Sequence, residues 1–298
     1  MLRSPQFRWR LIVVTLLLMT ILPAWQVSAQ SSDTTLSATT RAEFNKDRVT
    51  FKSGNLTLIG YLYKPDGKGP FPALIWNHGS EQSPGTGEEF DSIASVFVPQ
   101  GYVVFAPIRR GHGDSQGKYI VDVTAQAAQE KGAQFAKQLV VNLLAGEQLD
   151  DQIAGLDYLK KLAYVDTSRI GVIGCSYGGI ETIFGAESKA GYKVAVAMSP
   201  GAESWEGNEI LRQRLIDAVD HIKIPVLFMH PSQDASIEPG FVLAREFAKT
   251  HNKVGFGLII YPPLGTEAQQ GHCFGGPAAH WEKIWGDDAK RFLNTHLK

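Results

Sequence analysis

Gly174-Cys175-Ser176-Tyr177-Gly178 is a G-x-S-x-G pentapeptide, and the residues on either side of it give the pattern its meaning. An apolar run rich in β-branched residues, 169–173, precedes it and predicts a buried parallel strand. Residues 180–186 follow it and predict a helix. Strand, tight turn and helix form the setting of a nucleophile elbow, with Ser176 at the tip of the turn. An ordinary strand–helix turn is the alternative, and the preceding strand favours the elbow.

Apolar strands alternate with helical segments along the rest of the chain. Strands are predicted at 48–52, 56–63, 72–76, 101–106, 169–173, 194–198, 224–229 and 257–261. Uniformly apolar strands that alternate with helices predict an α/β fold whose sheet is mostly parallel, doubly wound and covered by helices on both faces. The first two strands, joined by a turn at 53–55, form a hairpin that supplies an antiparallel N-terminal edge.

Helical periodicity is predicted between these strands. It covers 88–98, 123–162, 180–186, 207–220, 239–250 and 278–296. The long segment 123–162 is expected to divide into two helices near Gly146 and Asp150. The regions 116–146 and 201–221 are the places where a small cap over a site is expected.

The N-terminus has the features of an exported protein. Three arginines precede the apolar stretch 11–22, and small residues at 27–29 offer a cleavage point before Gln30. The sequence predicts a signal peptide at 1–29, a flexible lead-in at 30–45 and one α/β domain at 46–298. Location in the periplasm or outside the cell follows from this interpretation. An uncleaved membrane anchor is the alternative, but the apolar stretch is short of the roughly 20 residues that a spanning helix needs.

The charge balance excludes several classes of partner. The chain has 29 basic and 30 acidic residues, and cleavage of the signal removes three arginines and leaves no basic run. We therefore expect neither nucleic acid binding nor stable membrane association after cleavage. The glycines at 85–87 and 111–113 complete no dinucleotide or phosphate-binding pattern, and the histidines lack zinc-site spacing. The sequence predicts no metal and no organic cofactor.

A serine nucleophile needs a base, and the base needs an orienting group. In a doubly wound sheet such groups gather at the carboxyl ends of the strands. Asp234 follows the strand 224–229, and His272 follows the last strand. The order Ser176, Asp234, His272 is the one expected after a nucleophile elbow. Glu238 is the alternative acid, and a solvated loop residue is the alternative interpretation of His272.

Hydrolysis through a serine also needs hydrogen-bond donors for the developing oxyanion. The N–H of Tyr177, directly after the nucleophile, is one candidate. The other is expected in the loop after the strand 72–76, where the N–H of Ser80 is favoured. Glu81 is an alternative donor, or its side chain faces the substrate or solvent. The small-molecule partner predicted by this arrangement is an ester.

Two cysteines lie beside the predicted catalytic residues: Cys175 precedes Ser176, and Cys273 follows His272. A disulfide between them is conceivable in an exported protein. Cysteine is also a common small buried residue, and the sequence favours this second interpretation.

These residues resemble the α/β-hydrolase superfamily, and more closely its dienelactone hydrolase-like branch, which is related to the catalytic domains of prolyl oligopeptidases. The resemblance covers about residues 48–298. It rests on the elbow, on Asp234 and His272, and on the segments 77–80, 109–115, 156–159 and 164–171. It implies an α/β-hydrolase fold and hydrolysis of esters, lactones or small amides without a cofactor.

The chain departs from these relatives in two ways. Dienelactone hydrolases proper use a cysteine nucleophile, whereas Ser176 holds that position here. Oligopeptidases carry a large N-terminal propeller, for which this chain has no room. The sequence therefore predicts an exported serine hydrolase of carboxylic esters or lactones. A peptidase or amidase is one alternative, and a non-catalytic binding protein on a hydrolase scaffold is the other.

Overall fold

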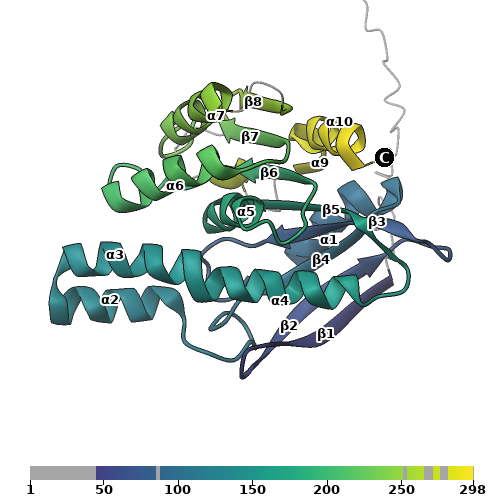
Figure 1. The fold of residues 1–298 in the computed structure, drawn as a ribbon, viewed down its shortest axis with the longest axis horizontal. Helices are drawn as coiled ribbons and strands as arrows, with labels where there is room; N and C mark the ends of the chain where they lie inside the picture. Colours follow the sequence, from purple (N-terminus) through teal and green to yellow (C-terminus); the bar gives the residue numbers. More distant parts are fainter. Residues whose placement is uncertain (1–44, 85–87, 251–253, 265–270, 276–280, 298) are drawn as a thin grey trace, which may run out of the picture. The chain divides into compact units, whose positions relative to one another are not determined.

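An eight-stranded sheet carries the fold (Figure 1). The computed structural model describes residues 45–84, 88–250, 254–264, 271–275 and 281–297. Its strands are β1 (Asn45–Ser53), β2 (Leu56–Lys64), β3 (Phe71–Asn77), β4 (Val103–Ile108), β5 (Val165–Cys175), β6 (Val194–Met198), β7 (Val226–Pro231) and β8 (Phe256–Tyr261). Their order in the sheet is β1-β2-β4-β3-β5-β6-β7-β8.

The sheet is parallel except at one edge. β1 pairs antiparallel with β2, and β2 pairs antiparallel with β4, whereas every later pair is parallel. This arrangement confirms the predicted fold class and its antiparallel N-terminal edge. The register places Asn77 beside Gly174, and Cys175 beside Met198. The carboxyl ends of β3, β5, β6 and β7 therefore lie at one edge of the sheet, where an α/β protein binds its ligands.

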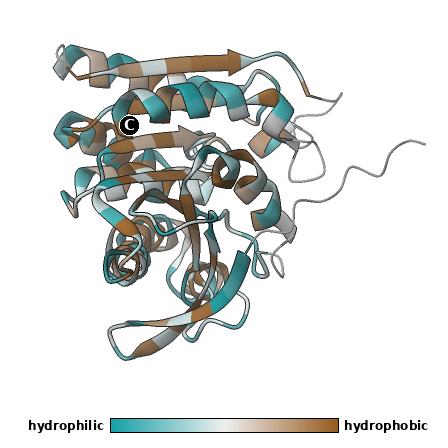
Figure 2. Cartoon of the chain, turned by 90° about the vertical axis from the view of Figure 1, so that its right-hand side faces the viewer, coloured by the Kyte–Doolittle hydropathy of each residue, from teal (hydrophilic) through white to brown (hydrophobic). Residues whose placement is uncertain are grey.

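Helices cover both faces of the sheet. They are α1 (Glu88–Phe97), α2 (Ile120–Lys131), α3 (Ala133–Leu143), α4 (Leu149–Lys160), α5 (Tyr177–Glu187), α6 (Glu209–His221), α7 (Glu238–Thr250), α9 (Trp281–Ile284) and α10 (Gly286–Leu297). Successive strand residues point to opposite faces, so Ile75 belongs to the hydrophobic cluster that includes residues of α4, α5 and α7, while Leu74 and Trp76 belong to the cluster that includes residues of α1 and α10. Figure 2 shows the hydrophobic central strands that result.

The segment 123–162 differs from its prediction. The first break is at Gly132, whose φ of 88° separates α2 from α3. Gly146 has non-helical φ and ψ inside a π-helical turn at 144–148 that leads directly into α4. Two helices were expected and three are present, because a glycine can end a helix without interrupting the apolar pattern around it.

The two segments expected to form a cap lie against each other. α2 and α3 run side by side (Figure 1), and α3 contacts α6. Lys137 on α3 forms an ion pair with Glu209 on α6 at 2.8 Å. Asn208, which caps α6, donates from Nδ2 to the Lys137 carbonyl at 3.2 Å.

Residues 1–44 lie outside the described part of the chain, so the expected signal peptide and nearly all of the lead-in are not described. The first described residue, Asn45, begins β1. Within the described ranges, no helix combines the length and the apolar character needed to cross a membrane.

Candidate active site

Ser176 lies at a sharp turn between β5 and α5. Its backbone has φ 59° and ψ −123°, a strained conformation for a residue with a side chain. Only glycine fits at the two positions that flank the turn. A Cβ at Gly174 would lie 2.5 Å from the Gly178 carbonyl oxygen, and a Cβ at Gly178 would overlap the Asn77 carbonyl. The turn therefore has the geometry of a nucleophile elbow, which places Ser176 at the carboxyl edge of the sheet.

The structure brings Asp234 and His272 together. Asp234 follows β7, and His272 begins a short 3-10 turn, 272–275. His272 Nδ1 lies 2.7 Å from Asp234 Oδ1, and the aspartate side chain is fully buried. The alternative acid, Glu238, instead accepts a hydrogen bond from Trp205 Nε1 at 3.1 Å. Asp234 is therefore the carboxylate that orients His272.

The charge states of this pair follow from their surroundings. Burial alone would raise the pKa of Asp234, but His230 and the hydrogen bond with His272 outweigh burial and hold that pKa well below its usual range. Burial alone would lower the pKa of His272, but Asp234, then Glu203 and Glu81, raise it above its usual value. At neutral pH the aspartate is ionised, and it stabilises a positive charge on the imidazole.

Glu203 is a site residue that the sequence did not indicate. It lies in the loop that follows β6, and its Oε2 is 3.7 Å from His272 Nε2. That ring nitrogen is buried and has no hydrogen-bond partner among the described residues. Glu81, in the loop after β3, also acts electrostatically on His272. The signal that could have revealed Glu203 is its place after the carboxyl end of a parallel strand.

The buried guanidinium of Arg109 anchors the loop after β3 by hydrogen bonds to its backbone. Its side chain is buried, donating from Nη1 to the His78 carbonyl at 2.8 Å and from Nη2 to the Gly79 carbonyl at 2.5 Å. The next residue, Ser80, accepts a hydrogen bond at its carbonyl from the Tyr119 hydroxyl. These contacts fix the direction of the backbone that carries the Ser80 N–H.

The two candidate oxyanion donors follow neighbouring strands. Asn77 and Gly174 are register partners, so the residues just beyond them, Ser80 and Tyr177, leave the same edge of the sheet. Tyr177 is the first residue of α5, where the leading N–H groups have no acceptor within the helix. Both amides thus follow the carboxyl ends of adjacent strands, on the side of the sheet where Ser176 lies.

Three further buried ionisable groups near this loop have pKa values that favour their uncharged forms at neutral pH. Burial and, to a smaller extent, the charge of Arg109 lower the pKa of His112 to about 4. His78, whose pKa burial also depresses, accepts a hydrogen bond at Nε2 from the Arg109 N–H at 3.1 Å. Burial raises the pKa of Glu181 to about 8. His78 and His112 therefore shape the loop.

Cys175 and Cys273 form a disulfide with a Cα–Cα distance of 5.9 Å. The prediction of two separate buried cysteines was wrong. Cys175 ends β5, and Cys273 belongs to the turn that begins with His272. Since that turn folds back over the carboxyl edge of the sheet, the two thiols meet although 98 positions separate them in the sequence.

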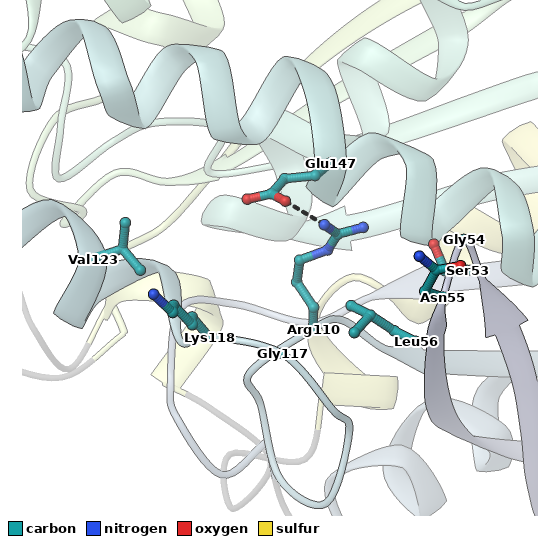
Figure 3. Close-up of a pocket in the computed structure, with 9 residues that line it drawn as sticks. All are labelled: Ser53, Gly54, Asn55, Leu56, Arg110, Gly117, Lys118, Val123 and Glu147. Carbon is teal, nitrogen blue, oxygen red and sulfur yellow. Dashed lines mark hydrogen bonds and ion pairs between the residues drawn. The ribbon is translucent and has the colours of Figure 1, made fainter.

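A cavity of about 430 Å³ opens beside the loop after β4 (Figure 3). Its lining includes the β1–β2 turn, Lys118, and Arg110 in an ion pair with Glu147. Ser176, Asp234 and His272 do not line it. Among the described residues, no group of three or more His, Cys, Asp or Glu side chains is arranged to hold a metal ion.

The model of the dienelactone hydrolase family matches residues 58–274. The chain belongs to the dienelactone hydrolase family. This confirms the resemblance inferred from the elbow and from the strand-end residues, and it makes the chain a hydrolase of the α/β-hydrolase fold.

Relatives of this family member carry names of different activities. A Synechocystis protein named carboxymethylenebutenolidase is 24% identical over 84% of this chain and 96% of its own. Dipeptidyl-peptidase 5 of Porphyromonas gingivalis is 24% identical over 64% of this chain, a match that spans only 30% of the peptidase. The structure of an esterase from Pyrococcus furiosus has a TM-score of 0.61 at 18% identity and covers 86% of this chain and 94% of the esterase. These likenesses leave ester and peptide substrates both open.

Proposed function

We propose that this dienelactone hydrolase family member is an exported serine esterase that cleaves carboxylic esters or lactones through Ser176, His272 and Asp234. The observation that carries the proposal is the 2.7 Å contact between His272 Nδ1 and Asp234 Oδ1, on a turn joined by a disulfide to the elbow of Ser176. A nucleophile, a base and an orienting carboxylate on three strand ends are the groups that acyl transfer needs.

In the first half of the reaction, Ser176 Oγ attacks the acyl carbonyl while His272 Nε2 accepts its proton. Asp234 holds the imidazole with the Nδ1 proton toward the carboxylate and stabilises the imidazolium that forms. The N–H groups of Tyr177 and Ser80 bind the oxyanion of the tetrahedral intermediate. His272 then returns the proton to the leaving alcohol, and the acyl group remains on Ser176.

In the second half, water replaces the alcohol. His272 takes a proton from the water, and the hydroxide attacks the acyl-enzyme. The oxyanion forms again in the same place, and its collapse releases the carboxylic acid and free Ser176. Every proton transfer uses Nε2, so the charge state of His272 governs both halves.

Export is supported by two features. Residues 1–29 have the pattern of a signal peptide, and disulfides persist in oxidising compartments. N-terminal sequencing of protein recovered from outside the cytoplasm is expected to begin at Gln30. Recovery of the chain only from the cytoplasm with its first residues intact would contradict export.

A peptidase is the second candidate, because two relatives are named dipeptidyl-peptidase 5. The experiment compares p-nitrophenyl esters and p-nitroanilides that share the same acyl group, across graded acyl lengths. We expect kcat/KM to be higher for the ester at every length, and to remain so for unactivated alkyl esters against alkyl amides. Faster hydrolysis of aminoacyl anilides than of the matched esters would overturn the esterase assignment in favour of the peptidase.

The pH dependence of kcat/KM reports the acidic surroundings of His272. A general base works in its neutral form, so activity rises as pH increases through the pKa of His272, which lies above its usual value of about 6.5. Glu203→Gln removes a negative charge 3.7 Å from Nε2, which lowers this pKa and moves the acidic limb to lower pH.

The control for this change is Glu209→Gln. Glu209 on α6 is paired with Lys137 on α3, and its substitution is expected to leave the profile unchanged. A profile that Glu203→Gln leaves in place, or moves to higher pH, would contradict the role assigned to Glu203.

A further inference from the structure

We propose that the Cys175–Cys273 disulfide is a positioning element of the active site, which holds the base His272 in line with Ser176. The inference rests on the proposed function. Each half of the disulfide is the immediate sequence neighbour of a reacting residue: Cys175 precedes Ser176, and Cys273 follows His272. One covalent bond therefore joins the nucleophile elbow to the turn that carries the base.

The turn has little regular structure of its own. Cys273 and Phe274 both have left-handed backbone conformations, with φ of 48° and 61°. Such conformations are unfavourable for residues with side chains and persist only when surrounding contacts impose them. The position of His272 must therefore come from what holds the turn.

Among the described residues, contacts to three different strand regions help to hold the turn. Phe274 is buried and packs edge-on against Tyr261 of β8, with ring centroids 5.2 Å apart. His272 itself binds Asp234, which follows β7. The disulfide leads to β5, the strand that ends beside Ser176. The first two contacts fix the turn to the far side of the sheet, and the third fixes it to the nucleophile.

The disulfide thus affects the alignment of His272 with Ser176 more than it affects substrate binding. A misplacement of about 1 Å between reacting groups can reduce a rate about 100-fold. Without the bond, the shortest covalent path between the two cysteines runs through the 98 positions that separate them in the sequence. We expect its loss to lower kcat by about 100-fold while KM stays nearly constant.

The test begins with the purified oxidised protein and tris(2-carboxyethyl)phosphine. The phosphine delivers two electrons to the bond and water supplies two protons, which gives the thiols of Cys175 and Cys273; the oxygen of the same water leaves as the phosphine oxide. Thiol titration follows the bond, far-UV circular dichroism follows the fold, and p-nitrophenyl ester hydrolysis gives kcat and KM. Labelling of Ser176 by a fluorophosphonate follows the reactivity of the nucleophile without any assumption about the natural substrate.

The expected result is a reduced protein with two free thiols, an unchanged circular dichroism spectrum, about 100-fold lower kcat and correspondingly slow labelling of Ser176. Reoxidation should restore both rates. Full kcat with two free thiols would overturn the proposal. Loss of the spectrum together with the activity would also overturn it, because the bond would then serve the fold.

Variants provide the matched comparison. Cys273→Ala, Cys273→Ser and the double variant Cys175→Ala/Cys273→Ala all remove the same bond, so their kcat values should agree with one another and with the reduced wild type. None should respond to the phosphine. If the double variant had a much lower kcat than Cys273→Ala, the loss would come from side-chain packing at each position. That result would contradict the proposal.

Two outcomes distinguish failure of the proposed function from failure of the role of the disulfide. If the oxidised wild type neither labels at Ser176 nor needs Ser176 for ester hydrolysis, the esterase proposal fails. If Ser176 labels equally fast in the oxidised and the reduced protein, only the role of the disulfide fails.

Discussion

Ser176→Ala is expected to lower kcat for a short activated ester by on the order of 10⁶-fold, the size of effect seen when a serine nucleophile is removed. The reason is that no other group at the elbow can form the acyl-enzyme. The loss should come without a change in thermal stability, because Ser176 sits on a turn whose shape is set by Gly174 and Gly178. The measurement is initial-rate kinetics beside a thermal melt.

The control is Ser83→Ala, since Ser83 is an exposed serine in the loop after β3 and takes no part in the proposed chemistry. It should keep full activity. A Ser176→Ala protein that is folded and retains more than about a hundredth of the wild-type kcat would place the reaction elsewhere, because removal of a nucleophile costs far more.

Asp234→Asn is expected to lower kcat by about 10⁴-fold. The asparagine fills the same space beside His272 Nδ1, but it no longer stabilises the imidazolium or favours the tautomer with the proton on Nδ1. Steady-state kinetics on one ester, with KM measured separately, isolates the effect on the chemical step.

Glu238→Gln is the matched control, because Glu238 is the alternative acid that the sequence left open. Its substitution keeps an oxygen for the Trp205 hydrogen bond and should leave kcat close to wild type. A collapse of activity in Glu238→Gln, with Asp234→Asn nearly unchanged, would reverse the assignment.

Much of the fold was predictable because it depends on local patterns. Uniformly apolar strands occur only where both faces of a sheet are covered, and the runs before Asn77, Cys175 and Pro231 show this plainly. The division between α2 and α3 was not predictable in the same way. The apolar pattern continues through Gly132, and only its φ of 88° ends the helix there.

In the candidate site, too, the features set by strand topology were predictable and those set by loop conformation were not. The pairing of Asp234 with His272 follows from topology, because the ends of neighbouring parallel strands must meet. The approach of Glu203 to His272 depends on how a loop folds, and sequence position alone does not set that. Prediction of the Cys175–Cys273 disulfide would have required the path of the turn 272–275. That turn returns to β5 through backbone conformations that the sequence does not indicate.

Mass spectrometry of the protein after reaction with a fluorophosphonate shows directly whether Ser176 is the nucleophile. We expect one phosphonyl group on Ser176, complete loss of ester hydrolysis in step with labelling, and no adduct in Ser176→Ala. A folded protein that hydrolyses esters while Ser176 stays unlabelled, or that carries the adduct on another residue, would contradict this assignment.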